Sequence, residues 1–439
     1  MTSPASPMRV RVHRGCHEVG GSCVEVEAEG ARLVLDVGRP LTAGPDDLAA
    51  LPDVPGLADG SDPSLLGVLI SHGHLDHYGL VDQVHSSVPV FAGRAASAIV
   101  EAARFFSPRG PALRPTGYLV DGQTFALGPF RVTPHLVDHS AFDAYAVVVE
   151  AAGRRLMYTG DLRGHGRKRS FARMLAAPPA GIDALLMEGT HVGSERHEPV
   201  TESRVEFDLA ATIRSTAGLA MVASSAQNID RLVTVYRAAR RAGRILLVDL
   251  YSATVAEATG RSTIPRPGFP GLGVWMPRRQ RVQVKESGEF HRTAAVRRYR
   301  VFTEELVAHP ERYVVLGGSS AAHELLRDRA LTAGGALVWS MWSGYLADPS
   351  GGRLREAARS AGVPLVEHHT SGHASVRDLG RLAAAVNPGR LVPIHTQGPQ
   401  QFAEHFANAA PQQDGAWWEV APHRALASSS AASRSPRCP

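Results

Sequence analysis

Cysteine is scarce in this chain, no long apolar run is present, and we expect no secretory leader. Cys16, Cys23 and Cys438 are too few for a disulfide framework, and one would be left over. We expect Cys16 and Cys23 to be small buried residues rather than metal ligands. No apolar run reaches the length of a membrane span, and residues 1–7 lack a basic or apolar leader character. These absences predict a soluble, cytoplasmic protein with reduced thiols and no membrane partner.

The length and charge distribution favour a multidomain protein with basic segments. A chain of 439 residues can form two or three domains with proper cores. The net charge is only +5, but residues 277–300 hold seven Arg and one Lys against two Glu. A second basic group consists of Arg163, Arg167, Lys168 and Arg169. Such segments bind polyanions such as nucleic acid, or form a solvated arginine-rich face, and charge alone leaves both open.

The first part of the chain has the alternation and turns of β structure. Residues 8–36 predict antiparallel strands, and residues 39–64 an irregular loop rich in Pro, Gly and Asp. A helix is expected at 95–106. Further strands are expected at 88–91, 131–137, 145–149, 156–159 and 183–187. These strands end in polar clusters, which predicts a sheet sandwich with functional loops along one edge.

The pattern changes near residue 195 to that of a parallel α/β unit. Asn228 is positioned to cap a helix that continues to Arg241 between strands at 219–223 and 245–249. Strands at 313–316 and 336–339 and a helix near 322–331 continue this pattern. From 366 the first pattern returns, with a helix at 375–386, a strand at 391–394 and a helix at 402–409. We therefore predict a first domain formed by 8–194 and 366–424, an inserted α/β domain at 195–365, and a disordered tail at 425–439.

The stretch His72-Gly73-His74-Leu75-Asp76-His77 is the strongest functional signal. It follows the apolar run 65–70, which reads as a buried strand, and Gly73 is expected to let the chain turn sharply. Imidazole and carboxylate groups at this spacing suit zinc, with manganese or iron as competitors. The alternative is a polar loop that happens to contain several histidines.

Isolated polar residues stand just after three other predicted strands. His139, Asp161 and His395 each occupy such a position. Together with residues 72–77 they supply five histidines and two aspartates, enough for a two-metal site with one bridging carboxylate.

These residues, with Asp36 at an early strand end, resemble the five motifs of the metallo-β-lactamase fold over roughly 8–192 and 366–420. The resemblance implies a four-layer αβ/βα sandwich. It also implies that His72, His74 and His139 hold one metal and that Asp76, His77 and His395 hold the other. Asp161 would bridge the two metals, and Asp36 would brace the histidines from behind.

The insertion before His395 resembles that of the β-CASP nucleases, with a Rossmann-like inserted domain. Glu188-Gly189-Thr190 resembles the acidic motif A, Ser371-Gly372-His373-Ala374 the motif B histidine loop, and Pro393-Ile394-His395-Thr396 motif C. The stretch 225–231 resembles the Asn-containing helix start of that domain. Gly189, and the Thr-Gln that follows His395, depart from the family pattern. No sign of the extra C-terminal domain of ribonuclease J is seen, so a shorter relative is expected.

The resemblance implies a hydrolase that cleaves phosphodiester bonds of single-stranded RNA through a hydroxide bridging two Zn²⁺ ions, with Mn²⁺ as an alternative metal. The expected catalytic residues are Asp76, Asp161, Glu188 and His373. His373 would donate a proton to the departing 3′ oxygen, and Glu188 would hydrogen-bond it and raise its pKa. Backbone N–H groups of Ser371, Gly372 and Ala374 would face a phosphate.

Two other functions stay open at this point. A small-molecule ester, lactone or thioester hydrolase would use the same metals but would not need Glu188 and His373. A non-catalytic RNA-binding subunit would not need the metal ligands. DNA as a substrate, a homodimeric state and the choice between endonuclease and 5′ exonuclease action are also left open.

Overall fold

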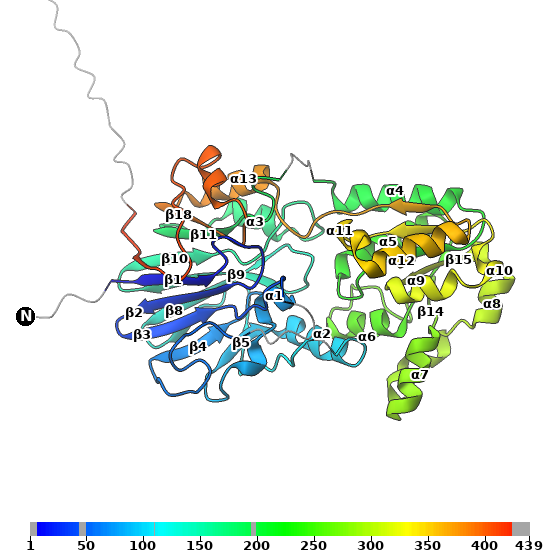
Figure 1. The fold of residues 1–439 in the computed structure, drawn as a ribbon, viewed down its shortest axis with the longest axis horizontal. Coiled ribbons are helices and arrows are strands. Elements are labelled where there is room, and N and C mark those ends of the chain that lie inside the picture. Colours follow the sequence, from blue (N-terminus) through cyan, green and yellow to red (C-terminus); the bar gives the residue numbers. More distant parts are fainter. Residues whose placement is uncertain (1–6, 44–49, 109, 195–198, 424–439) are drawn as a thin grey trace, which may run out of the picture.

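The computed structural model describes residues 7–43, 50–108, 110–194 and 199–423. The predicted disordered tail at 425–439 and Cys438 lie outside the described residues. Figure 1 shows two lobes side by side, one built from both ends of the chain and the other from its middle. The chain therefore leaves the first lobe and returns to it, as the predicted insertion requires.

Two mixed sheets face one another in the first lobe. One sheet is antiparallel from β19 to β3 and parallel from β3 to β6. In order across this sheet, its strands are β19 (Trp417–Glu419), β1 (Arg9–Arg14), β2 (Cys23–Ala28), β3 (Ala31–Leu35), β4 (Leu65–Leu69), β5 (Val90–Gly93) and β6 (Gly117–Leu119).

In the second sheet, the strands from β18 to β10 are parallel and those from β10 to β7 antiparallel. In order across the sheet, they are β18 (Arg390–Ile394), β11 (Ala184–Glu188), β10 (Arg154–Tyr158), β9 (Ala144–Ala151), β8 (Phe130–Val137) and β7 (Phe125–Leu127).

Strand periodicity explains why both faces of each sheet are buried. In β3, Leu33 and Leu35 enter the core between the sheets, whereas Val34 enters a second cluster on the outer face. In β9, Val147 enters the core between the sheets and Val148 the cluster under the outer helices. Helices α1 (Leu75–Tyr78) and α2 (Arg94–Arg104) lie after strands of the first sheet. Helices α3 (Ser170–Ala176) and α13 (Val376–Val386) cover the second sheet. The result is the expected αβ/βα sandwich.

The second lobe contains one fully parallel sheet with helices around it. In order across the sheet, its strands are β14 (Leu272–Val274), β13 (Ile245–Val248), β15 (Tyr313–Gly317), β12 (Ala220–Ala223), β16 (Ala336–Trp339) and β17 (Leu365–Glu367). Its helices are α4 (Glu202–Ser215), α5 (Ile229–Arg241), α6 (Leu250–Ala258), α7 (Arg278–Ser287), α8 (Thr303–Ala308), α9 (Ser319–Leu325), α10 (Arg329–Thr332), α11 (Gly344–Ala347) and α12 (Pro349–Ser360), with 3₁₀ turns at η2 (Phe290–Tyr299) and η3 (Pro310–Arg312). This is the Rossmann-like inserted domain that the resemblance implies.

The predicted elements agree with the structure except in a few places. The single helix expected at 322–331 is two short helices, α9 and α10, because the Asp328 side chain caps the second by accepting from Ala330 N. The helix expected at 402–409 is wrong. The chain there forms the 3₁₀ turn η4 (Pro399–Glu404), and Ala410 N then bonds to Leu391 O beside β18. Another 3₁₀ turn, η1 (Val81–Gln83), follows α1.

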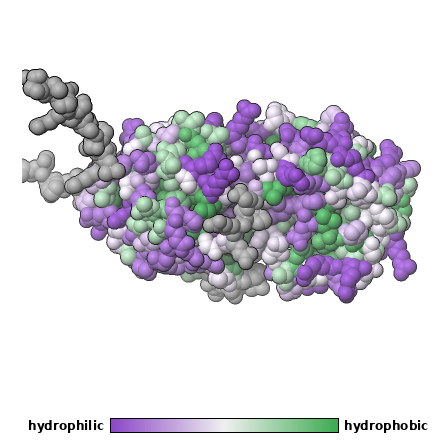
Figure 2. Space-filling model, turned by 90° about the horizontal axis from the view of Figure 1, so that it is seen from above, coloured by the Kyte–Doolittle hydropathy of each residue, from purple (hydrophilic) through white to green (hydrophobic). Residues whose placement is uncertain are grey.

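Cys16 and Cys23 agree with the prediction that they are small buried residues. Cys16 and Cys23 are buried and free, and burial raises the pKa of both thiols. Within the described residues, none of the helices combines the length and apolar character needed to cross a membrane. The face seen in Figure 2 mixes hydrophilic residues with small, separate hydrophobic patches over both lobes.

Candidate metal centre

The predicted ligands converge because they follow strands that end at one edge of the sandwich. The loop after β4 carries His72 and His74, and α1 carries Asp76 and His77. His139 follows β8, Asp161 follows β10 and His395 follows β18. The side chains form four overlapping groups of possible metal ligands. Within each group, one ligand atom of every residue lies within 4.8 Å of those of the other members. Together the groups include all seven predicted ligands.

Three histidines form the first donor group. His74 Nδ1 lies 3.2 Å from His72 Nε2 and 3.1 Å from His139 Nε2. The opposite nitrogen of His139, Nδ1, donates to the carbonyl oxygen of Gly372 at 2.5 Å. That bond fixes the ring so that Nε2 faces the centre, which is the usual second contact of a metal-ligating histidine.

The second donor group contains Asp76, His77, Asp161 and His395. His395 Nε2 lies 3.3 Å from Asp76 Oδ2, and His77 Nε2 lies 3.2 Å from Asp161 Oδ2. Asp161 Oδ2 is also 3.7 Å from His72 Nε2 and 3.9 Å from His139 Nε2. Asp161 therefore stands between the two groups, where a bridging carboxylate would stand.

The donor set fits divalent cations. Among the described residues, His77 Nε2 and both carboxylate oxygens of Asp161 are buried without a hydrogen-bond partner. Buried polar atoms normally have partners, so these three unpaired ligand atoms, which face one another, are suited to binding a cation. Nitrogen and carboxylate oxygen donors suit Zn²⁺ and, less well, Mn²⁺. The fold and these donors together indicate divalent metal binding.

Asp36 holds the loop from behind, as expected. Its Oδ2 lies 2.8 Å from His77 Nδ1 and accepts from Ser71 Oγ at 2.7 Å and Tyr158 OH at 2.5 Å. Its Oδ1 accepts from Ser71 N at 2.7 Å. Asp36 and His395 adopt positive φ values of 61° and 50°, a strained backbone that surrounding contacts must maintain. The hydrogen bonds from Ser71 and Tyr158 to Asp36 were not predicted from the sequence. They depend on how β3, β4 and β10 pack together, which brings the three residues into contact.

Gly73 has a different role from the one expected. Its φ is not positive, so the residue is not needed for a special turn conformation. A Cβ at this position would lie 3.2 Å from Val100 Cγ2 on α2. The glycine provides space for close packing instead.

His373 and Glu188 lie beside the donor set. His373 Nδ1 is 3.5 Å from Glu188 Oε2 and 3.6 Å from Asp161 Oδ2. Thr190 Oγ1, which was quoted only as part of motif A, lies 3.0 Å from His373 Nδ1 and 2.9 Å from His395 Nδ1. Thr190 thus joins the outer histidine to a predicted ligand.

Charge and burial set the protonation of these groups. Burial lowers the pKa of His72, His74 and His139, which favours the neutral ring that a metal requires. Burial also opposes protonation of His373, but Glu188 and Asp161 outweigh it and raise the pKa of His373 to about 9. For His77, burial is likewise outweighed, and the carboxylates led by Asp161 raise its pKa.

The prediction that three backbone N–H groups of the loop at 371–374 face a phosphate is wrong for Ala374. Ala374 N donates to Glu188 Oε1 at 3.1 Å, so this N–H is not available to a phosphate. Ser371 uses its side chain to accept from His373 N and its carbonyl to accept from Arg163 Nη1. The N–H groups of Ser371 and Gly372 stay predictions.

Arg163 of the basic group at 163–169 is not part of a nucleic-acid surface, whereas Arg169 is exposed. Arg163 is fully buried and donates to Asp138, Glu202 and Asp230 at 3.2, 3.4 and 2.6 Å. Lys168 Nζ reaches the His139 carbonyl oxygen at 3.3 Å. Since Glu202 and Asp230 belong to α4 and α5, Arg163 connects the metal loops to the inserted domain, whereas the Lys168 bonds stay within the first lobe. The sequence did not reveal this because the acidic partners lie far along the chain.

The other basic segment does reach the surface of the inserted domain. A cleft of about 1220 Å³ is lined by a set of cationic side chains, with Glu286 and Glu324 as the acidic members. The cationic set is Arg278, Arg279, Arg281, Arg327 and Arg353.

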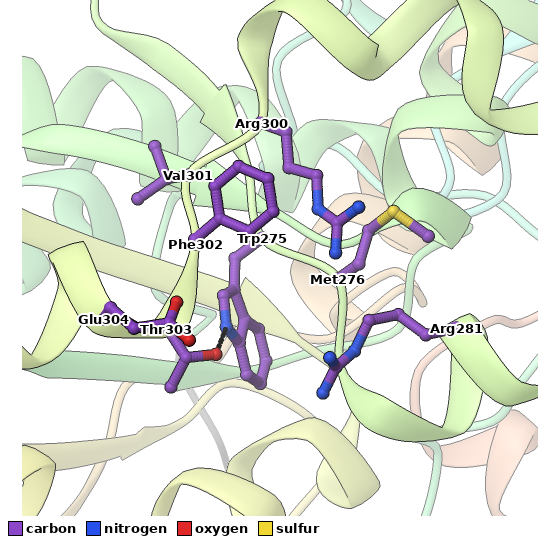
Figure 3. Close-up of a pocket in the computed structure, with 8 residues that line it drawn as sticks. All are labelled: Trp275, Met276, Arg281, Arg300, Val301, Phe302, Thr303 and Glu304. Atoms are coloured by element: carbon purple, nitrogen blue, oxygen red, sulfur yellow. Dashed lines mark hydrogen bonds between the residues drawn. The ribbon is translucent and has the colours of Figure 1, made fainter.

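A neighbouring cavity of about 50 Å³ is too small for a nucleotide. Figure 3 shows Arg281 and Arg300 on either side of Met276, and Trp275 Nε1 donating to Thr303 Oγ1 at 3.3 Å.

The fold and the donor set resemble those of metallo-β-lactamase-fold proteins with an inserted β-CASP-type domain. A family profile described as "Beta-lactamase superfamily domain" matches residues 41–232. The chain is similar in sequence to ribonucleases J. Ribonuclease J from Sinorhizobium meliloti is 24% identical over 362 residues, which cover 79% of this chain and 60% of that protein. Ribonuclease J from Pyrococcus abyssi is 24% identical over 444 residues, covering 91% of each chain.

A solved structure shows the same fold over nearly the whole chain. The crystal structure of a protein of unknown function from Enterococcus faecalis V583 matches with a TM-score of 0.77 and 20% identity. The match covers 94% of this chain and 100% of that chain. In contrast, this chain spans less than two thirds of the length of the Sinorhizobium protein.

Proposed function

We propose that this chain is a metal-dependent nuclease that hydrolyses phosphodiester bonds of single-stranded RNA. The observation that carries the proposal is the Glu188–His373 pair, which lies beside a donor set able to hold two cations. The similarity to ribonucleases J and the arginine-lined cleft support a polyanionic substrate. RNA is preferred over DNA because of those relatives. A homodimeric state and a cytoplasmic location remain predictions from the sequence.

Two Zn²⁺ ions, or Mn²⁺ in their place, would occupy the two donor groups. His72, His74 and His139 would hold one ion, and Asp76, His77 and His395 would hold the other, with Asp161 shared between them. When bound, such a pair supplies charge neutralisation for the phosphodiester oxygens and lowers the pKa of the attacking water.

His373 would supply the proton that the departing 3′ oxygen needs. Its Nδ1 faces Thr190, Glu188 and Asp161, which leaves Nε2 as the nitrogen to face the substrate. Glu188 and Asp161 outweigh burial and raise the pKa of His373, which favours the protonated ring. Glu188 holds the same loop through Ala374 N, so it positions His373 as well as stabilising its charge.

Labelled single-stranded RNA incubated with the protein, with and without chelator, tests the proposal. We expect cleavage that stops with chelator and returns with Zn²⁺ or Mn²⁺. The absence of chelator-sensitive cleavage with any divalent metal would refute it. His373→Ala separates this function from ester or lactone hydrolysis by the same ions, because only the phosphodiester reaction requires the protonated histidine at the leaving group.

A further inference from the structure

Large exposed apolar side chains gather around the metal centre. Nine such side chains are exposed in the described part of the chain, and four of them concern this region. They are Leu41 (63% exposed), Leu75 (39%), Trp342 (61%) and Tyr345 (52%). Single exposed apolar side chains are common on protein surfaces and need no explanation. Several of them close together beside a candidate active site indicate a surface that contacts a ligand.

Leu41 lies beside Asp76 on the metallo-β-lactamase side. A Cβ placed on Gly20 would lie 2.7 Å from Leu41 Cγ and 3.0 Å from Asp76 Cβ, so those two side chains are neighbours. Leu75 precedes Asp76 in the sequence and begins α1. Leu41 therefore borders the second donor group, whereas the Leu75 side chain lies toward Gly110 and Tyr78.

Trp342 and Tyr345 face this region from the inserted domain. Figure 1 places α11, which contains Tyr345, on the side of the inserted domain toward the first lobe. The two rings are 5.3 Å apart in an edge-to-face arrangement. Burial and then the charge of Asp76 raise the pKa of Tyr345, which puts its hydroxyl within the electrostatic reach of that carboxylate.

The backbone under the two rings is held firmly. Trp342 O accepts from Trp339 Nε1 and from Tyr345 N, both at 3.2 Å. Arg231 Nη1 donates to Ser340 O at 2.8 Å and so links this loop to the buried charges around Glu202. The exposed rings are therefore presented on a fixed loop.

We infer that an unpaired nucleobase next to the cleaved linkage stacks on one ring of the Trp342–Tyr345 pair and contacts the other, perpendicular ring with its edge, with Leu41 bordering the same nucleotide. The inference rests on the proposed function, since it names how that site selects its substrate. Stacking on aromatic rings is tolerant of base identity and requires a base released from its duplex. The pair thus selects single-stranded nucleic acid without reading its sequence.

The test compares Trp342→Ala, Tyr345→Ala and the double variant with wild type on a short single-stranded RNA whose cleaved linkage has been mapped. A second substrate set carries an abasic nucleotide at each flanking position. We expect KM to rise roughly 5- to 100-fold in the alanine variants with kcat little changed, as for loss of one base stack. With the wild-type protein, KM for the abasic RNA should be higher than KM for the intact RNA by the same factor. With the alanine variants, KM for the two RNAs should be equal, because the stacking contact is already lost.

Three further variants control the experiment. Phe207→Ala removes a 60% exposed aromatic ring from α4 and should leave KM unchanged. Trp342→Phe should retain most of the affinity. Gly344→Ala would place a Cβ 2.3 Å from the Trp342 ring and should displace it, raising KM while both aromatic residues remain.

The outcomes distinguish a failure of the stacking inference from a failure of the proposed nuclease function. If wild type cleaves RNA and the alanine variants keep its KM, the inference is wrong and the proposed function stands. If wild type cleaves no RNA, both fail. If the variants lose self-association in sedimentation experiments without a change in KM, the pair belongs to an interface between copies, and the inference is again wrong.

Discussion

Glu202 is the residue whose replacement should most clearly reveal the junction between the two domains. Its side chain is fully buried at the start of α4. Its Oε1 lies 3.1 Å from Arg231 Nη2 and 3.4 Å from Arg163 Nη1, and its Oε2 accepts from Thr234 Oγ1 at 2.7 Å. Glu202→Gln keeps the size of the side chain but leaves two buried guanidinium groups short of one negative charge.

The loss of folding stability in Glu202→Gln can be derived in two independent ways. Burial opposes ionisation of Glu202, but Arg231 and Arg163 outweigh it and lower its pKa from 4.5 to about 2. That difference corresponds to roughly 3 kcal/mol of stability at neutral pH. Removing one partner of a buried ion pair costs about 3–5 kcal/mol. The lower end applies here, since Asp138 and Asp230 continue to neutralise Arg163.

Urea unfolding of wild type and variant at several pH values measures this cost. The folded-state pKa is depressed, so the contribution is fully present above pH 4.5 and is lost as the pH falls toward about 2. We expect a lower unfolding midpoint for Glu202→Gln from pH 8 to about 5, with the gap narrowing below that. Glu356→Gln is the matched control, because its bond to Arg359 joins side chains that are 56% and 79% exposed and should change little. Equal midpoints for wild type and Glu202→Gln at pH 7, or a gap that does not narrow in acid, would refute the reasoning.

Three further predictions concern the metal centre. His373→Ala should lower kcat for RNA by about 10²- to 10⁴-fold, the usual contribution of a general acid, while metal content measured by mass spectrometry stays unchanged. Asp161→Asn should lower the bound metal to clearly less than two equivalents per chain, because the variant loses the carboxylate between the two donor groups. Gly38→Ala should abolish metal binding or folding, since the new Cβ would lie 1.8 Å from the Asp76 carbonyl oxygen. Gly352→Ala, with nothing within 4 Å, is its control and should not destabilise the protein.

Each of these predictions has an outcome that would contradict it. Full activity in His373→Ala would remove this residue from proton transfer. Two tightly bound metal equivalents in Asp161→Asn would show that no carboxylate is shared. Wild-type metal content in Gly38→Ala would show that the loop around Asp76 is less rigid than the contact distances indicate.

Much of the metal centre could be predicted because strand ends determine it. His72, His139, Asp161 and His395 each follow a short apolar strand, and the ends of neighbouring strands meet at one edge of a sandwich. Local sequence therefore places the residues close together without any knowledge of distant contacts. The same argument explains why the helix at 229–241 was predicted with its Asn228 cap, which accepts from Arg231 N.

The remaining features depend on residues that are distant in sequence. Arg163 belonged to a basic group that could have been a polyanion surface, and only the packing of α4 and α5 against its loop makes it a buried cation. A buried arginine and an exposed one have the same sequence pattern, because burial depends on what covers the side chain.

By itself, the sequence determined the ligand types, their order along the chain and the presence of an inserted parallel domain, since strand periodicity and polar strand ends are local properties. Only the tertiary structure decided that Thr190 joins His373 to His395, that Ala374 N is taken by Glu188, and that Tyr345 comes within the electrostatic reach of Asp76. These contacts join segments from different strands and domains, and their geometry follows from how the layers pack rather than from any one segment.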